Sequence, residues 1–275
     1  MTEITTMDTA LPENLDKVST EELMKLTGQL DHNTTKASVS RLAINHATED
    51  FDGNALPRGW FSLTTPPEGP VYGEKATMRV FMRTYSYFVW DNEASAFSCQ
   101  TVQAPSFGSD FYDTAGGKKC GKLDYNTLEA LPKDSPEWAV QKSIKCTQNL
   151  YGLVSFENAV NKDGSKTTVK DVPCVWYAKG ANFTPVADCL KSLSRQKQPM
   201  WLMNIGLSSV RKKKGGNIYF HSELTPQKAV SWSEDDDALM RQFMESVKSY
   251  NDNVMKAYNS AGSDDKIEYD SVINE

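Results

Sequence analysis

The segment from Lys75 to Asp91 limits most strongly what this chain can fold into. It is long, rich in aromatic and β-branched residues, and lacks helix caps, which favours a strand. Residues 148–158, 200–210 and 217–224 have the same character. Residues 211–216 predict a hairpin connection between the last two segments, because Gly215 and Gly216 supply a permissive backbone. The chain is therefore expected to be mainly β.

Helices are expected around these strands. A capping-box pattern at Ser19 predicts a short helix near the N-terminus. Thr184 is the predicted N-cap of a helix inside the β-rich region, with Pro185 at its first position. Ser233 is the predicted N-cap of a last helix, whose acidic first turn suits the helix dipole. We predict an α+β class, mainly β: a small closed barrel or half-open β body with one internal helix, then a C-terminal helix and an acidic tail.

Charge is distributed unevenly along the chain. Residues 1–56 hold 4 Lys/Arg against 10 Asp/Glu, residues 57–225 hold 21 against 15, and residues 226–275 hold 5 against 11. The corresponding net charges are −6, +6 and −6. We predict three parts with these bounds: an acidic N-terminal arm, a basic β-rich domain that binds nucleic acid, and a C-terminal helix with an acidic tail. The alternative is that carboxylates simply solvate the helices and termini.

One face of the predicted strand at 75–91 has the composition of a ligand-binding surface. With a two-residue period, the side chains on that face are Arg79, Phe81, Arg83, Tyr85 and Tyr87. Alternating guanidinium groups and flat rings suit an unpaired nucleic-acid strand, because bases stack on rings and cations contact phosphates. In the alternative interpretation, the rings lie under another layer and both arginines lie at its rim.

Two basic clusters extend this prediction. Arg211, Lys212, Lys213 and Lys214 lie at the predicted hairpin tip, beside Tyr219 on the returning strand, and suit non-specific phosphate contact. The alternative for this tip is a turn that keeps the protein soluble. The second cluster lies in a loop that also contains aromatic residues, and consists of Lys118, Lys119 and Lys122.

The sequence motifs of common enzyme classes are absent or incomplete, so catalysis is not predicted and no cofactor is expected. The segment 116–122 fits GxxxxGK, but Leu123 follows where a phosphate-binding loop needs Ser or Thr. Neither GxSxG nor HExxH occurs. No metal is expected, because scattered cysteines are most often buried thiols; a zinc site from Cys99, Cys120, Cys146 and His221 is the alternative.

The expected location is the cytoplasm, without a membrane. The polar, acidic N-terminus beginning Met1-Thr2-Glu3 lacks the basic start and apolar run of a secretory signal. No apolar stretch approaches the roughly 18 residues of a membrane-spanning helix.

The plan of the chain resembles that of bacteriophage single-stranded-DNA-binding proteins with an OB fold. The resemblance rests on the segment 79–87, the basic segment 211–214 and the acidic end from Asp264. It implies a protein that coats single-stranded DNA without sequence specificity during phage replication or recombination in the host cytoplasm, and it is compatible with a homo-oligomer. It also implies that a tail containing Asp264, Asp265, Glu268 and Asp270 recruits replication proteins. The alternative function is a virion or assembly protein that binds other proteins through the β body and the C-terminal helix.

Overall fold

The computed structural model describes residues 39–50, 53–65 and 69–262. The chain divides into two units, Met1–Ser38 and Val39–Glu275, and only residues of the second are described. The predicted N-terminal helix and the acidic tail lie outside the described residues.

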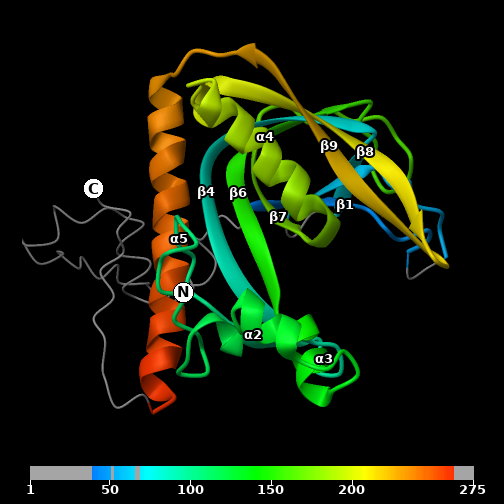
Figure 1. Ribbon diagram of the computed structural model, residues 1–275. Coiled ribbons are helices and arrows are strands. Elements are labelled where there is room, and N and C mark those ends of the chain that lie inside the picture. The colour runs from blue at the N-terminus through cyan, green and yellow to red at the C-terminus, as the bar shows by residue number, and fades with distance from the viewer. Residues whose placement is uncertain (1–38, 51–52, 66–68, 263–275) are drawn as a thin grey trace, which may run out of the picture. The chain divides into compact units, whose positions relative to one another are not determined.

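The described residues of this unit form a nine-stranded sheet (Figure 1). Its order is β3-β2-β1-β7-β6-β4-β8-β9, with β5 also paired to β4. All neighbouring pairs are antiparallel except β1 and β7, which are parallel. In the described part the order ends at β3 and β9, so the sheet is open and a closed barrel is not formed. The strands are β1 (Ser40–Ile44), β2 (Phe61–Thr64), β3 (Pro70–Gly73), β4 (Lys75–Asp91), β5 (Ala96–Gln100), β6 (Lys145–Glu157), β7 (Val172–Lys179), β8 (Met203–Lys214) and β9 (Asn217–Ala229).

Strand β4 is the central element, and its predicted bounds are confirmed. It pairs with β6 along most of its length, with β8 near its start and with β5 near its end. Its register against β6 shifts between Val80 and Met82, which makes Phe81 a β-bulge. Nearby, a Cβ at Gly152 would overlap the backbone carbonyl of Arg79, so only glycine permits this close approach of the strands.

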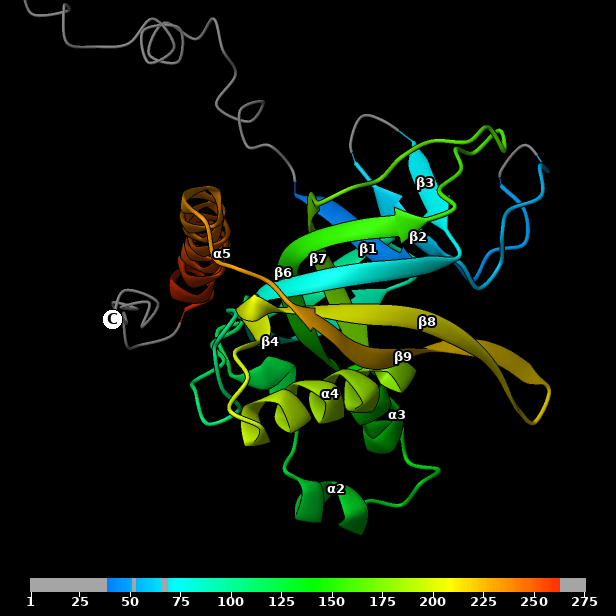
Figure 2. The ribbon, with the colours of Figure 1, turned by 90° about the horizontal axis from the view of Figure 1, so that it is seen from above.

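A helix covers part of each face of the sheet (Figures 1 and 2). Helix α4 (Phe183–Arg195) contacts β9 and β7 and buries Val186, Leu190 and Leu193 in the main core. Helix α5 (Glu234–Ser260) lies on the opposite face and packs Phe243 and Val247 against Phe81 and Tyr151. The remaining helices, α2 (Tyr125–Ala130) and α3 (Pro136–Ser143), lie in the connection between β5 and β6.

The helix predictions are confirmed to different degrees. Ser233 is the N-cap of α5, and a complete capping box with Asp236 is present. Helix α4 begins at Phe183, with Asn182 as N-cap, so the predicted cap at Thr184 is wrong by two residues. Helices α2 and α3 were not predicted, because each is short and buries few side chains.

The predicted hairpin connection is too long. Strands β8 and β9 pair until Lys214 and Asn217, so the turn contains only Gly215 and Gly216. Two-residue turns require a positive φ, and Gly215 has φ 60°. The sheet also begins earlier than the predicted domain bound at residue 57, because β1 pairs with both β2 and β7.

Candidate functional site

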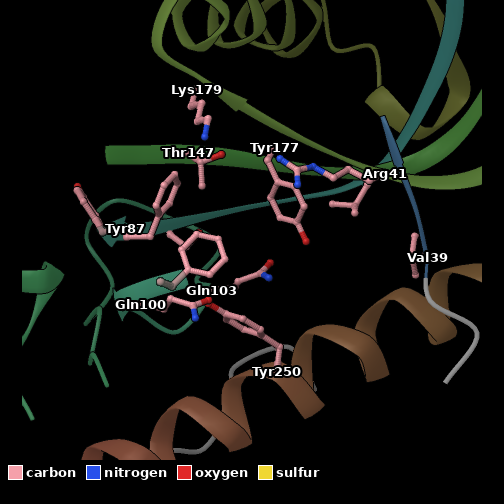
Figure 3. Close-up of a pocket in the computed structure, with 13 residues that line it drawn as sticks. Val39, Arg41, Tyr87, Gln100, Gln103, Thr147, Tyr177, Lys179 and Tyr250 are labelled. Carbon is pink, nitrogen blue, oxygen red and sulfur yellow. The ribbon is translucent and has the colours of Figure 1, made fainter. Parts of the chain in front are cut away.

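A groove lies on the face of the sheet that α5 partly covers (Figure 3). It encloses about 370 Å³, which is within the usual range of ligand pockets. Strands β1, β4, β5, β6 and β7 and helix α5 all contribute to it. The lining residues are Val39, Arg41, Ser86, Tyr87, Phe88, Phe97, Gln100, Gln103, Thr147, Val175, Tyr177, Lys179 and Tyr250.

The groove contains two cations and no carboxylate. The Arg41 guanidinium lies over the ring of Tyr177, with 5.7 Å between the guanidinium carbon and the ring centroid. The Lys179 Nζ lies 4.8 Å from the ring centroid of Phe88. No Asp or Glu lines the groove, and neither cation forms a salt bridge within residues 39–50, 53–65 and 69–262. Two cations without a carboxylate, placed beside rings, are chemically suited to an anion that has a flat, apolar part.

Strand alternation determines which side chains enter the groove. In β7, Val175, Tyr177 and Lys179 point to the groove, because the residues between them, including the buried Trp176, belong to the main core. Strand β1 runs parallel to β7 with Arg41 opposite Val175, so Arg41 extends over the same face. The arrangement therefore follows from ordinary strand geometry.

The positive charges in and near the groove repel one another when no anion is bound. Burial lowers the pKa of Lys179, and the positive charges of Arg41 and Lys145 lower it further. A bound anion would reduce this repulsion and stabilise the charged form of the lysine. The groove is thus better suited to an anion than to a neutral ligand.

Aromatic rings form one wall of the groove and continue beyond it. The ring of Phe97 packs edge-on against Phe88 at 5.3 Å and against Trp90 at 4.9 Å between centroids. Phe97 and Trp90 remain 47% and 43% exposed, and Tyr177 is 37% exposed. Rings that are fixed by neighbours and still accessible can stack on a flat ligand at little entropic cost.

Hydrogen bonds fix the polar part of the groove. The side-chain oxygen of Gln103 accepts hydrogen bonds from the hydroxyls of Thr84 at 2.6 Å and Tyr151 at 3.0 Å. The Asn251 side chain pairs with the backbone of Gln103 in both directions, and the Tyr250 hydroxyl donates to the side chain of Gln100. Helix α5 therefore holds the polar floor in place, as Figure 3 shows for Tyr250.

The prediction that the segment 79–87 presents one exposed face is wrong. The bulge at Phe81 shifts the alternation, so that Arg79 and Phe81 lie on the α5 side and Tyr85 packs on the other. Arg79 forms a salt bridge with Asp236 and lies over Phe81, which is 1% exposed. These two residues support the packing of α5, as the alternative interpretation expects.

The other residues of that segment lie elsewhere. The Tyr85 ring is buried, with its centroid 4.1 Å from that of Phe107, and Arg83 lies over it. Tyr87 packs on Phe111 and also lines one end of the groove. Burial raises the pKa of Tyr87, so its hydroxyl stays protonated.

The predicted basic loop is only partly available to a ligand. Lys118 pairs with Asp110 at 2.6 Å, and Lys119 lies over the ring of Phe111. Lys122 donates to the backbone carbonyl of Gln141, and burial lowers its pKa. None of the three lysines lines the groove.

The basic hairpin tip is exposed but separate from the groove. Arg211, Lys212, Lys213 and Lys214 are the last residues of β8, and the described residues offer them no salt bridge. Tyr219 is the cross-strand partner of Lys212. In both Figure 1 and Figure 2, the β8–β9 hairpin extends away from α5, so that its tip lies far from that helix. None of the four basic residues of the tip lines the groove.

Sequence reasoning missed the residues that define the groove. Arg41, Tyr177 and Lys179 lie in strands that were not predicted. Phe88 was expected on the core face of the strand at 75–91, and Phe97 was not assigned a role. The run of apolar, β-branched and aromatic residues from Val172 to Tyr177 is the signal that would have found β7.

None of the helices in the described segments is long and apolar enough to cross a membrane. No protein-family model, curated protein or solved structure matches this chain.

Proposed function

We propose that this protein binds single-stranded DNA without sequence specificity, with the groove on the α5 side of the sheet as its central contact. The observation that supports this most directly is the pair of cations, Arg41 and Lys179, held among aromatic rings without a carboxylate. An unpaired nucleic-acid strand offers both an anionic backbone and flat, accessible bases, and few other ligands combine them.

The two kinds of group have separate roles in this proposal. Arg41 and Lys179 neutralise phosphates, which supplies affinity that does not depend on sequence. Phe97 and Tyr177 provide faces on which bases stack, and every base has such a face. No bond is made or broken, so we propose a binding protein and not an enzyme.

The strand order supports an OB-like core within this proposal. Strands β4, β6, β7, β8 and β9, with α4 between β7 and β8, follow the chain order of a five-stranded OB core. OB folds bind oligonucleotides on the face of their second and third strands and with the loops after the first and fourth strands. Here β6 and β7 take the second and third places and contribute to the groove. The connection that follows the first contains Lys118 and Lys119, and the fourth ends in the basic segment Arg211–Lys214, directly before the turn.

The rival function is a virion or assembly protein that binds other proteins through the β body and the C-terminal helix, and the helix does not support it. Helix α5 buries Phe243, Val247, Val254, Met255 and Tyr258 against its own chain. Its main apolar face is therefore not available to a partner.

A titration of a fluorescent oligonucleotide at two salt concentrations tests the proposal. We expect binding that weakens as salt rises, with a slope of about −0.7 in log affinity for each phosphate neutralised. The double variant Arg41→Gln/Lys179→Gln should bind less tightly and show a smaller slope. The exposed Lys133, which does not line the groove, gives a matched control in Lys133→Gln. Affinity that is independent of salt, or no binding at low salt, would refute the proposal.

A further inference from the structure

A second site lies beside β5, outside the groove. The sulfur atoms of Cys99 and Cys120 and a carboxylate oxygen of Asp113 all lie within 4.8 Å of one another. Cys99 and Asp113 are buried, whereas Cys120 is partly exposed. Three side chains with negatively chargeable donor atoms thus meet at one point that a small solute can reach from the Cys120 side.

The Asp113 carboxylate is held in a fixed orientation. Its Oδ1 accepts hydrogen bonds from the backbone N–H groups of Ala115 and Gly117, and its Oδ2 accepts one from Cys120. No Lys, Arg or His forms a salt bridge with it in the part of the chain that the structure describes. A carboxylate has about four lone-pair sites, so Oδ2 keeps one for another partner. Such hydrogen bonds to a carboxylate are typical of the groups that orient a metal ligand.

The backbone brings Cys120 to this position at a conformational cost. Lys119, Cys120 and Gly121 form a 3₁₀ turn in which all three residues have positive φ, at 55°, 53° and 73°. For the two non-glycine residues this conformation is unfavourable and persists only when the surrounding structure requires it. The amide hydrogen bond from Cys120 to Asp113 is one such requirement.

We propose that Cys99, Cys120 and Asp113 bind a thiophilic divalent cation of the zinc class. Zinc takes thiolate sulfur at about 2.3 Å and carboxylate oxygen at about 2.0–2.2 Å in a tetrahedral arrangement. The corresponding separations between these ligand atoms are about 3.5–3.8 Å. The three atoms lie within 4.8 Å of one another, so the sulfur atoms need to move only a short distance to form the site. Each thiol releases its proton to solvent when it binds the cation, and a water molecule completes the four-coordinate shell.

The site has a structural consequence. Cys99 belongs to β5, the strand that also carries Phe97, whereas Asp113 and Cys120 belong to the connection that follows it. A bound cation therefore ties β5 to residues 113–121. Of the other residues considered for zinc from the sequence, Cys146 and His221 do not belong to this cluster.

Cobalt substitution in the full-length, reduced protein tests the proposal. We expect one Co²⁺ per chain, a thiolate-to-metal charge-transfer band, and displacement of the cobalt by Zn²⁺. Cys99→Ser and Cys120→Ser should each lose the band. Cys146→Ser is the matched control and should keep it, because burial raises the pKa of Cys146 to about 11 and its thiol lies outside the cluster.

If a variant does not fold, thiol mapping of the wild-type protein by mass spectrometry provides an independent test of the metal site. Zinc should slow alkylation of Cys99 and Cys120 in the wild-type protein and leave that of Cys146 unchanged. A folded, reduced protein that shows neither the band nor this protection would overturn the proposal. A Cys99–Cys120 disulfide that forms in air, together with no metal binding after reduction, would also overturn it.

Discussion

Individual side chains of the groove contribute little to stability, because they are exposed or lack a carboxylate partner, but they remain available to a ligand. Arg41 and Lys179 both lie in it without a carboxylate, and their mutual repulsion contributes to the lowered pKa of Lys179. Exposed rings such as Phe97 contribute little to the core but remain available for stacking.

Phe97→Ala and Tyr177→Ala should each weaken binding of single-stranded DNA by about 1–3 kcal/mol, because each removes one stacking surface. The fold should persist, since both rings are substantially exposed. Fluorescence anisotropy measures the affinity and circular dichroism the fold. Tyr125→Ala, which removes a 73% exposed ring from α2, is the control and should bind normally. Normal binding by both groove variants would contradict the stacking role.

Affinity for DNA should fall at alkaline pH because of Lys179. Its lowered pKa means that the ammonium loses its charge at a lower pH than an ordinary lysine, and attraction to phosphate is lost as pH rises through that pKa. Affinity measured across the alkaline range should therefore fall earlier in the wild type than in Lys179→Arg, whose side chain stays charged. Identical pH profiles of the two proteins would rule out this role of Lys179.

At the scale of secondary structure elements, the β-bulge in β4 decides which predicted residues are accessible. Strand β4 has the predicted bounds, but the extra residue at Phe81 changes which face the later side chains occupy. Regular alternation could be predicted from the sequence, and the bulge could not, because it depends on how β6 pairs with β4.

Phe81→Ala should destabilise the fold by about 3–5 kcal/mol, as expected for a buried aromatic ring packed by its neighbours. Chemical denaturation measures this loss. Phe97→Ala is again the comparison and should change stability much less. If Phe81→Ala lost no more free energy of unfolding than Phe97→Ala, the Phe81 ring would not be part of the packing between α5 and β4.

The β8–β9 hairpin tip should add non-specific electrostatic affinity. Replacing Arg211, Lys212, Lys213 and Lys214 by Gln should reduce the salt slope of binding by up to about 2.8, at about 0.7 for each cation that contacts a phosphate. Stability should not change, since all four side chains are exposed. An unchanged slope would show that the tip does not contact DNA.

At the scale of the whole molecule, a basic middle region lies between two acidic ends in the sequence. The tail containing Asp264, Asp265, Glu268 and Asp270 lies outside the described residues, so its role remains a prediction from charge. A tethered acidic segment has an effective concentration near the millimolar range, so we expect it to compete with DNA for basic sites.

Truncation after Ala261 should therefore tighten DNA binding, most clearly at low salt where charges are least screened. It should also remove any contact with replication proteins made through the tail. Titrations at low and high salt with the full and truncated chains provide the measurement. The same affinity for both chains at each salt concentration would mean that the tail only solvates the C-terminus.

The sequence alone determined the local features of this protein. The bounds of β4, the N-cap at Ser233 and the glycines of the β8–β9 turn depend on neighbouring residues, so they could be predicted. Tertiary structure decided which side chains share a face. The groove combines Arg41 with Tyr177 and Lys179 because β1 pairs in parallel with β7, more than 130 residues later in the chain. Such pairing is selected by packing of the whole sheet, because local propensity does not encode which distant strand becomes a neighbour.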